Sequence, residues 1–226
     1  YMASRQRSFD CMADDQVAAL NHYSTTTELA LPRMMAAQIM GIGINGYISG
    51  SWADWTILPA LNVVYDALYT GDLSFAAQFF DAMVRNHTYG WLMDPKTNLV
   101  TSPHLSALID TSGGSNDGFQ TTSVNAVVNA WSYLSLRQLA RLARWLDRTN
   151  DAAALDATAD QLRQGFLNLL FNGTSAICDG VCATTPHNSV HSTFYALYAG
   201  MADGNASLTA ALASYVRARA VEDQVK

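Results

Sequence analysis

The sequence predicts an all-α fold made of helical hairpins. Apolar residues recur at the three- and four-residue spacing of amphipathic helices along most of the 226 residues. No segment alternates apolar and polar residues over enough length to indicate a long strand. Short and long loops alternate between the helical segments, as they do in successive helical hairpins. We expect the long loops to gather on one face and to carry the function.

Eight segments with this spacing define the expected helices. In chain order they cover residues 14–23, 25–40, 54–69, 73–93, 122–147, 151–171, 191–201 and 207–221. No linker of low-complexity composition divides them, so we treat residues 1–226 as one domain.

Capping residues justify the helices of the first half. The run Thr25-Thr26-Thr27-Glu28 supplies capping chemistry at the start of the second helix. Glycines between residues 41 and 50 predict a loop after that helix. Pro59 falls near the first turns of the third helix, and Gly71 predicts its end, so that the fourth helix starts at residue 73.

Loop composition justifies the helices of the second half. Residues 94–120 contain Pro95, Pro103 and the run Ser-Gly-Gly-Ser-Asn-Asp-Gly, and they are therefore expected to be mostly loop. Two long helices follow and pair, because only a short turn separates them. A loop over residues 172–188 then precedes the last two helices.

Composition and charge exclude several classes of protein. Half of the residues are hydrophobic and 14% are charged, which excludes an intrinsically disordered chain. The net charge of −6 disfavours nucleic acid as a partner, because such a field repels phosphate. The longest uncharged stretch, Met34–Ala53, is too rich in glycine and polar residues for a membrane span. Four arginines at helical spacing predict a solvated helix edge: Arg137, Arg141, Arg144 and Arg148.

Cysteines and glycosylation sequons favour a secreted protein. Cys178 and Cys182 enclose Asp-Gly-Val, a spacing that suits a local disulfide in a loop. Since the chain starts at Tyr1 without a charged leader, we expect any targeting segment to have been removed. Sequons of the form Asn-x-Ser/Thr make three asparagines candidate glycosylation sites: Asn86, Asn172 and Asn205.

Two further motifs have simpler interpretations. The run Gly41-Ile-Gly43-Ile-Asn-Gly46 matches the glycines of a dinucleotide-binding turn, but a helix precedes it where that turn requires a strand. Four residues resemble a set of zinc ligands: Cys178, Cys182, His187 and His191. The span between the second cysteine and the first histidine is short for a zinc finger. We expect a disulfide and two unrelated histidines, with neither a metal nor another cofactor.

Acidic and aromatic residues at loops and helix starts indicate carbohydrate chemistry. Tryptophan faces stack on the apolar patches of sugar rings, while Asp, Arg and His side chains bind the hydroxyls, and acid pairs cleave glycosidic bonds. The candidates are Arg5, Arg7, Asp10, Asp14, Asp15, Trp52, Asp54, Trp55, Asp110, Asp117 and His191. Each type has a structural alternative: core aromatics for the tryptophans, caps or turns for the aspartates, and a surface position for the histidine.

In their order and spacing, these residues resemble the catalytic domain of family-78 glycoside hydrolases, the α-L-rhamnosidases. The resemblance runs from the first residue to about Gly200. Its pieces are Arg5-Gln6-Arg7, Ala13-Asp14, His22-Tyr23, Glu28-Leu-Ala-Leu-Pro-Arg33, Trp52 with Trp55, Tyr69-Thr-Gly-Asp72, Leu108-Ile-Asp110, Asp117-Gly-Phe119, Val124-Asn125-Ala-Val-Val-Asn129-Ala130 and His191 before Phe194-Tyr-Ala-Leu197.

The resemblance implies an (α/α)6 barrel, in which six helical hairpins surround a funnel, and this chain looks like about two thirds of one. It also implies hydrolysis with inversion, by a general acid and a separate carboxylate base that activates water. Residues that match sugar-contact or acid-site positions are Asp14, Trp55, Asp110, Asp117 and His191. Arg5 and Arg7 match positions that hold hydroxyls or orient the acids, and Trp52, Asp54 and Asn125 are further candidates for substrate binding.

Departures from the family pattern concern mainly the catalytic acids. The family usually carries an acidic residue inside the Arg-x-Arg motif, whereas this sequence has Gln6, whose amide cannot protonate a leaving group. Asp10, Asp14 and Asp15 are the nearest carboxylates that could serve instead. The family's base lies beyond the last helix present, so we expect it outside this chain. Thr111 also replaces the usual tryptophan after Asp110.

We therefore expect a secreted glycosidase that releases terminal α-L-rhamnose from a rhamnose-containing glycoside or polysaccharide. Its partner would be the missing remainder of its own polypeptide, comprising the other helices and any accessory β-domains. A non-catalytic carbohydrate-binding protein of the same fold is the alternative, and a purely structural helical scaffold would leave the candidate residues scattered. An open ring of helices would expose apolar faces.

Overall fold

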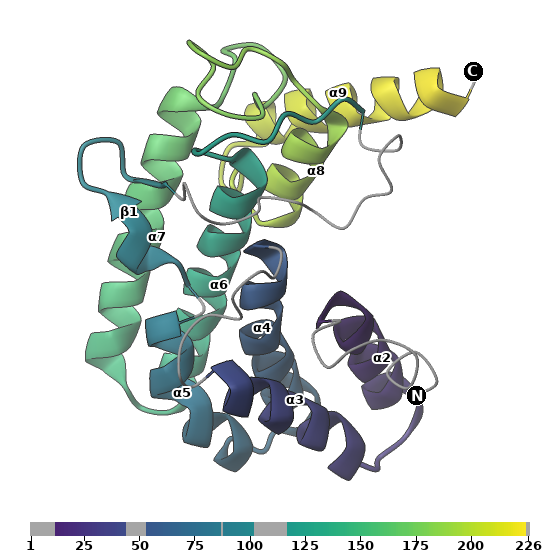
Figure 1. Ribbon diagram of the computed structural model, residues 1–226, viewed down its shortest axis with the longest axis vertical. Helices are drawn as coiled ribbons and strands as arrows, with labels where there is room; N and C mark the ends of the chain where they lie inside the picture. The colour runs from purple at the N-terminus through teal and green to yellow at the C-terminus, as the bar shows by residue number, and fades with distance from the viewer. Residues whose placement is uncertain (1–11, 44–52, 87, 102–116, 225–226) are drawn as a thin grey trace. The chain divides into compact units, whose positions relative to one another are not determined.

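The computed structural model describes residues 12–43, 53–86, 88–101 and 117–224, and within these ranges the all-α prediction is confirmed (Figure 1). The α-helices are α2 (Met12–Thr25), α3 (Ala30–Gly43), α4 (Ala53–Thr70), α5 (Ser74–Asn86), α6 (Ala126–Trp145), α7 (Thr149–Leu169), α8 (Val190–Tyr198) and α9 (Ala206–Gln224). After α5 come a 3-10 turn, η1 (Gly90–Leu92), and an antiparallel pair of short strands, β1 (Met93–Asp94) and β2 (Leu99–Val100). Within the described ranges, no helix is long and apolar enough to cross a membrane.

The chain divides into two compact units. The first, here called the N-terminal unit, comprises residues up to Trp91 together with Ser135–Ala157. The second, the C-terminal unit, comprises Leu92–Leu134 together with the residues from Thr158 onward. Helices α6 and α7 each contribute one part to the first unit and one part to the second.

Helix α4 is the centre of the N-terminal unit. Helices α2, α3 and α5 all pack against it. Apolar side chains that are at most 1% exposed form the core here, among them Ile57, Leu61, Val64, Phe80 and Met83. Gly71 ends α4 as predicted, because its φ of +71° is a conformation that glycine adopts without strain.

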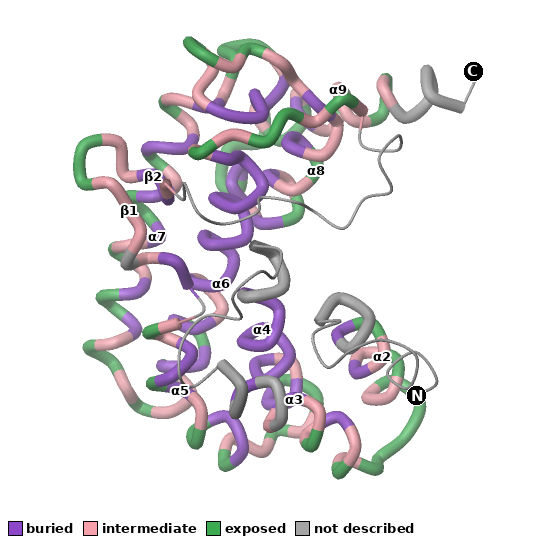
Figure 2. The backbone as a smooth tube through the Cα atoms, in the orientation of Figure 1, coloured by how far each residue is buried: buried purple, intermediate pink, exposed green. Residues whose placement is uncertain are grey.

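The first part of α6 is the centre of the C-terminal unit. Every residue from Asn125 to Leu134 is buried (Figure 2), which is typical of a helix surrounded by other elements. The side-chain amide of Asn129 bonds both backbone groups of Val100, at 2.8 and 3.1 Å, and so ties β2 to this helix. A Cβ at Gly165 would lie 2.2 Å from the carbonyl oxygen of Thr97, so glycine lets the hairpin approach α7.

Helix α5 ends at Asn86 and not near residue 93 as the apolar spacing predicted. The hydroxyl of Thr88 donates to the carbonyl of Val84 and accepts from the backbone N–H of Gly90. Tyr89 then adopts a left-handed φ of +52° with its side chain fully buried. The buried tyrosine explains why the predicted helix is too long, because it extends the apolar pattern past the turn.

Other helix boundaries also differ from the predicted ones. Helix α3 continues to Gly43, into the expected loop, because glycine costs a helix only about 1 kcal/mol. Helix α6 begins at Ala126 and not at residue 122, since the Asn125 side chain caps it by accepting from the backbone N–H groups of Val127 and Val128. Helix α8 ends at Tyr198 and not at residue 201, just before Gly200 with its φ of +83°.

The four arginines predicted as a solvated edge lie on or just after α6, and they form ion pairs and a cation–π contact that the prediction did not include. Arg137 and Arg144 both pair with Asp156, and Arg148 pairs with Asp81 and Asp151 at 2.6 Å. The Arg141 guanidinium lies over the Trp145 ring, 4.7 Å from its centroid. This edge therefore holds α6 and α7 together within the N-terminal unit.

Candidate functional site

The structure describes the side chains of only part of the predicted site. Arg5, Arg7, Asp10, Trp52 and Asp110 lie outside the described residues. The backbone of four further candidates is described but not their side chains: Asp14 and Asp15 in the first turn of α2, and Asp54 and Trp55 in the first turn of α4. The predicted site residues with described side chains are Asp117, Asn125 and His191.

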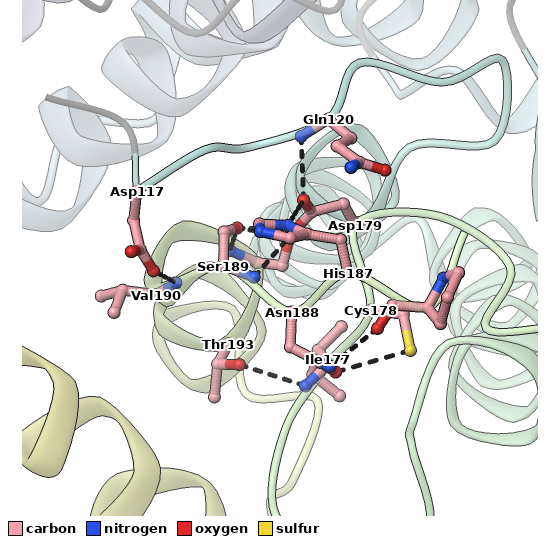
Figure 3. Close-up of polar contacts among 12 residues, drawn as sticks. Asp117, Gln120, Ile177, Cys178, Asp179, His187, Asn188, Ser189, Val190 and Thr193 are labelled. Atoms are coloured by element: carbon pink, nitrogen blue, oxygen red, sulfur yellow. Dashed lines mark hydrogen bonds and ion pairs between the residues drawn. The ribbon is translucent and has the colours of Figure 1, made fainter. Parts of the chain in front are cut away.

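Asp117 lies at the start of α8 in space, although it is distant from that helix in sequence. Its carboxylate accepts from the backbone N–H of Val190 at 2.9 Å (Figure 3). It also accepts from the guanidinium of Arg219 at 2.6 Å. Its φ of +50° and the φ of +68° at Gly118 form the left-handed turn that aims the carboxylate there. The turn role considered for Asp117 is therefore real, and a helix N-terminus is also a favourable place for its negative charge.

His191 lies in the first turn of α8, beside Asp117. Burial lowers the pKa of its imidazole, against the opposing effect of the Asp117 and Asp179 carboxylates. Its Nδ1 is buried and has no hydrogen-bond partner among the described residues. The structure thus brings two predicted residues, Asp117 and His191, to one helix start.

Asp179 is the central residue of this cluster, and the sequence analysis did not identify it. Its side chain is fully buried. One oxygen, Oδ2, accepts from the Gln120 backbone N–H at 2.8 Å and faces Nδ1 of His187 at 2.7 Å. The other, Oδ1, accepts from Ser189 through its backbone N–H at 3.1 Å and its hydroxyl at 2.6 Å, and from the Ser192 hydroxyl at 2.7 Å.

Through these bonds Asp179 fixes the starts of two helices. Ser189 caps α8, with its hydroxyl accepting from the Ser192 backbone N–H. The backbone carbonyl of Asp179 accepts from the N–H of Ala126, the first residue of α6. Asn125, the cap of α6, is buried, and its Nδ2 has no partner among the described residues. The predicted candidates Asn125 and His191 are therefore both held near Asp179.

The predicted disulfide is present and encloses Asp179. Cys178 and Cys182 are bonded, with their Cα atoms 5.4 Å apart. Gly180, inside this loop, packs so closely that a Cβ would lie 2.6 Å from the Thr122 hydroxyl. No group of residues that could hold a metal ion occurs in the described ranges, and the cysteines of the zinc-like set are oxidised instead.

A signal for Asp179 was available in the sequence. It is the residue directly after Cys178, in a loop that was interpreted only for its disulfide. An acidic residue inside a cross-linked loop that also has histidine and serines nearby is a candidate for a buried hydrogen-bond centre. The spacing could not identify its partners, because Gln120 is far from it in the chain.

A second cluster of polar side chains lies in the N-terminal unit. The Arg33 guanidinium binds Asp66 through Nε at 3.0 Å and through Nη2 at 2.9 Å, and it binds Asp72 through Nη1 at 3.0 Å. The Tyr23 hydroxyl donates to Asp66 at 3.0 Å, and burial, together with the Asp66 charge, raises the pKa of this phenol. These residues join α2, α3, α4 and the start of α5.

Comparison with known proteins supplies the family. The family described as the bacterial alpha-L-rhamnosidase 6 hairpin glycosidase domain matches residues 24–224. No curated protein matches the chain. Among solved structures, the GH78 family rhamnosidase of Bacillus sp. GL1 has a similar fold, with a TM-score of 0.73 over 89% of this chain at 20% sequence identity. This chain spans 22% of the length of that protein. The chain therefore belongs to the bacterial α-L-rhamnosidase six-hairpin glycosidase domain family and forms part of that helical barrel, as its residues had predicted.

Proposed function

We propose that this chain is part of the catalytic barrel of an α-L-rhamnosidase that removes terminal α-L-rhamnose with inversion. The observation that carries the proposal is the cluster at the start of α8. There Asp117 and His191, distant in sequence and both matching sugar-contact positions, lie together in a chain of a rhamnosidase family. A polyol needs such a mixture of acceptors and donors at a cluster of loops.

The described side chains suit hydroxyl binding. Each carboxylate oxygen of Asp117 has two lone pairs, so the bonds to Val190 and Arg219 leave capacity for a sugar hydroxyl. His191 and Asn125 each offer a buried nitrogen without a partner among the described residues. We assign further sugar contacts to the predicted residues Arg5, Arg7, Trp52, Asp54, Trp55 and Asp110.

The chemistry requires two carboxyl groups. In an inverting enzyme they lie about 6.5–9.5 Å apart, which leaves room for the attacking water. We propose that Asp10, Asp14 or Asp15 is the general acid, since Gln6 cannot donate a proton to the leaving group. We place the base in the remainder of the polypeptide.

Gln6 also favours a second candidate function. A chain that lost its acid but kept its hydroxyl-binding side chains would be a carbohydrate-binding protein without turnover. Binding of L-rhamnose with no hydrolysis would establish this alternative.

We further propose secretion, with the rest of the polypeptide as the partner of this chain. The disulfide supports an oxidising compartment, and two of the three sequon asparagines, Asn172 and Asn205, are exposed. Helix α8 exposes Phe194 by 47% and Tyr198 by 50%, with their rings stacked. We propose that a further hairpin of the same barrel covers this exposed aromatic face.

The test is hydrolysis of a chromogenic aryl α-L-rhamnoside by the complete protein. We expect turnover by the wild type and a loss of at least tenfold in kcat/KM for His191→Ala, which corresponds to about 1.4 kcal/mol. The control is His22→Ala, at a histidine of α2, which should change kcat/KM little. Proton NMR of the first-formed sugar should show the inverted anomer. The retained anomer would contradict inversion, and a protein that neither binds nor cleaves rhamnosides would contradict both functions.

A further inference from the structure

His187 is held beside the candidate site by Asp179. Its Nδ1 is 2.7 Å from Oδ2 of Asp179. The Asp179 side chain is fully buried, whereas the His187 side chain is 35% exposed. One edge of the imidazole is therefore anchored in the protein while part of the ring reaches the surface.

The contacts of Asp179 decide which ring nitrogen carries the proton. Oδ2 already accepts from the backbone N–H of Gln120, and Oδ1 accepts from Ser189 and Ser192. Because an ionised carboxylate can only accept hydrogen bonds, Nδ1 of His187 is the donor in this contact. In the neutral ring, Nε2 is then left with a lone pair and acts as an acceptor.

The Nε2 edge of the ring lies against the loop of Asp117. A Cβ added to Gly118 would be 3.4 Å from Nε2 and 3.5 Å from Cε1 of His187. Gly118 directly follows Asp117, whose carboxylate binds Val190 at the start of α8 (Figure 3). The acceptor of His187 is therefore on the same side of the cluster as the loop that carries Asp117.

We propose that His187 is a further sugar-binding residue of this site, which accepts a hydroxyl hydrogen bond at Nε2, and that Asp179 is the positioning residue that fixes its ring and tautomer. This inference rests on the proposed function, because it takes L-rhamnose as the ligand. It assigns a specific acceptor role to a histidine that the family resemblance left unused.

The first test titrates the complete protein, labelled with ¹⁵N in its histidines, with L-rhamnose. The free protein should show His187 with the proton on Nδ1, and saturation with L-rhamnose should shift its Nε2 resonance. Asp179→Asn should change the tautomer signal of His187, because an amide can present a donor to Nδ1. An Nε2 resonance that stays fixed while binding saturates would overturn the inference and leave the proposed function standing.

The second test compares two substitutions of His187. Asn retains a donor near the position of Nδ1 and so keeps the bond to Asp179, but it has no group at the position of Nε2. Gln places an amide oxygen near Nε2. We expect His187→Asn to raise the Kd for L-rhamnose about tenfold, the range of one hydrogen bond, and His187→Gln to recover part of that loss.

The same substitution at His22 in α2 is the control and should leave the Kd unchanged. Wild-type affinity in His187→Asn would overturn the inference alone. Equal losses in the Asn and Gln variants would also overturn it, because packing and not an acceptor would then explain the effect. A wild-type protein that binds no L-rhamnose would overturn the proposed function together with this inference.

Discussion

Among the described side chains, each of the two units buries one aspartate completely, and they stabilise it in different ways. In the N-terminal unit, Asp66 accepts hydrogen bonds from Nε and Nη2 of the Arg33 guanidinium and from the Tyr23 hydroxyl. In the C-terminal unit, Asp179 is held by two backbone N–H groups, two serine hydroxyls and the His187 imidazole. Both side chains are 0% exposed.

This difference supports the proposal that Asp66 has a structural role and that Asp179 organises a site. Arg33 neutralises Asp66 and belongs with it to helices of the same packed core, so the pair has no charge left for a ligand. The donors around Asp179 are backbone N–H groups, serine hydroxyls and the His187 imidazole, and they belong to loops and helix starts. A buried carboxylate of the second kind can organise a site, because its partners are the groups that a ligand would meet.

The largest effect should follow from breaking the Arg33–Asp66 pair. We expect Asp66→Ala to destabilise the N-terminal unit by about 3–5 kcal/mol, since it leaves a partly buried guanidinium without its main partner. Hydrogen exchange of peptides from α2 to α5 in the complete protein would measure this loss, while the affinity for L-rhamnose should stay unchanged at temperatures where the unit is folded.

Asp81→Ala is the matched control for that substitution. Asp81 pairs with Arg148, but its side chain is 64% exposed, and an exposed ion pair contributes little to stability. If both substitutions reduced protection by the same amount, burial would not distinguish these carboxylates and the comparison of the two units would lose its basis.

The sequence predicted the helices well, because apolar spacing reports directly on burial along a helix. It failed where a local turn overrides that spacing, as after α5. This helix ends at Asn86, although the left-handed Tyr89 beyond it still has its side chain in the core. The capping role of Asn125 shows the same limit. Side-chain bonds to the backbone set the boundary, and the apolar pattern does not record them.

Residue types and a family resemblance suggested candidate residues, but the local sequence pattern could not show which of them lie together. Asp117 and His191 meet because the segment that carries Asp117 lies at the start of α8, and no local pattern encodes that contact. Asp179 was missed because its importance comes from Gln120, His187 and Ser189, which the fold brings to it. Residue types near a helix start predict possible ligands, whereas the groups that hold them in place require the structure.

Removing the disulfide around Asp179 should have an intermediate effect on the free energy of unfolding. Replacing both Cys178 and Cys182 by serine should cost about 2 kcal/mol, because the closed loop is short and restricts the unfolded chain only modestly. Hydrogen exchange should rise in peptides that cover residues 176–192 and stay constant in α2 to α5. Equal increases in both units would show that the loop supports the whole chain and not only the Asp179 cluster.

The smallest effect should be a pH dependence that only the C-terminal unit shows. Burial lowers the pKa of His191 from its ordinary value of 6.5, and the nearby Asp117 and Asp179 only partly oppose this. The unfolded chain therefore binds this proton more tightly than the folded one, so folded-state stability falls as the pH drops through 6.5. Urea unfolding at pH 7.5 and 5.5 should show a smaller decrease for His191→Gln than for the wild type.

The sign of that change bears on the comparison of the two buried aspartates. If Asp179 and Asp117 acted on His191 as Asp66 acts on Arg33, they would outweigh burial, raise the pKa of the imidazole and make the protein more stable at low pH. A wild type that gains stability relative to His191→Gln on acidification would therefore show that this cluster is an ion-paired structural core. A wild type that loses stability would show that burial outweighs these carboxylates, of which Asp117 is already paired with Arg219 and Asp179 with backbone and serine donors. His191 would then be an uncharged group able to bind a sugar hydroxyl.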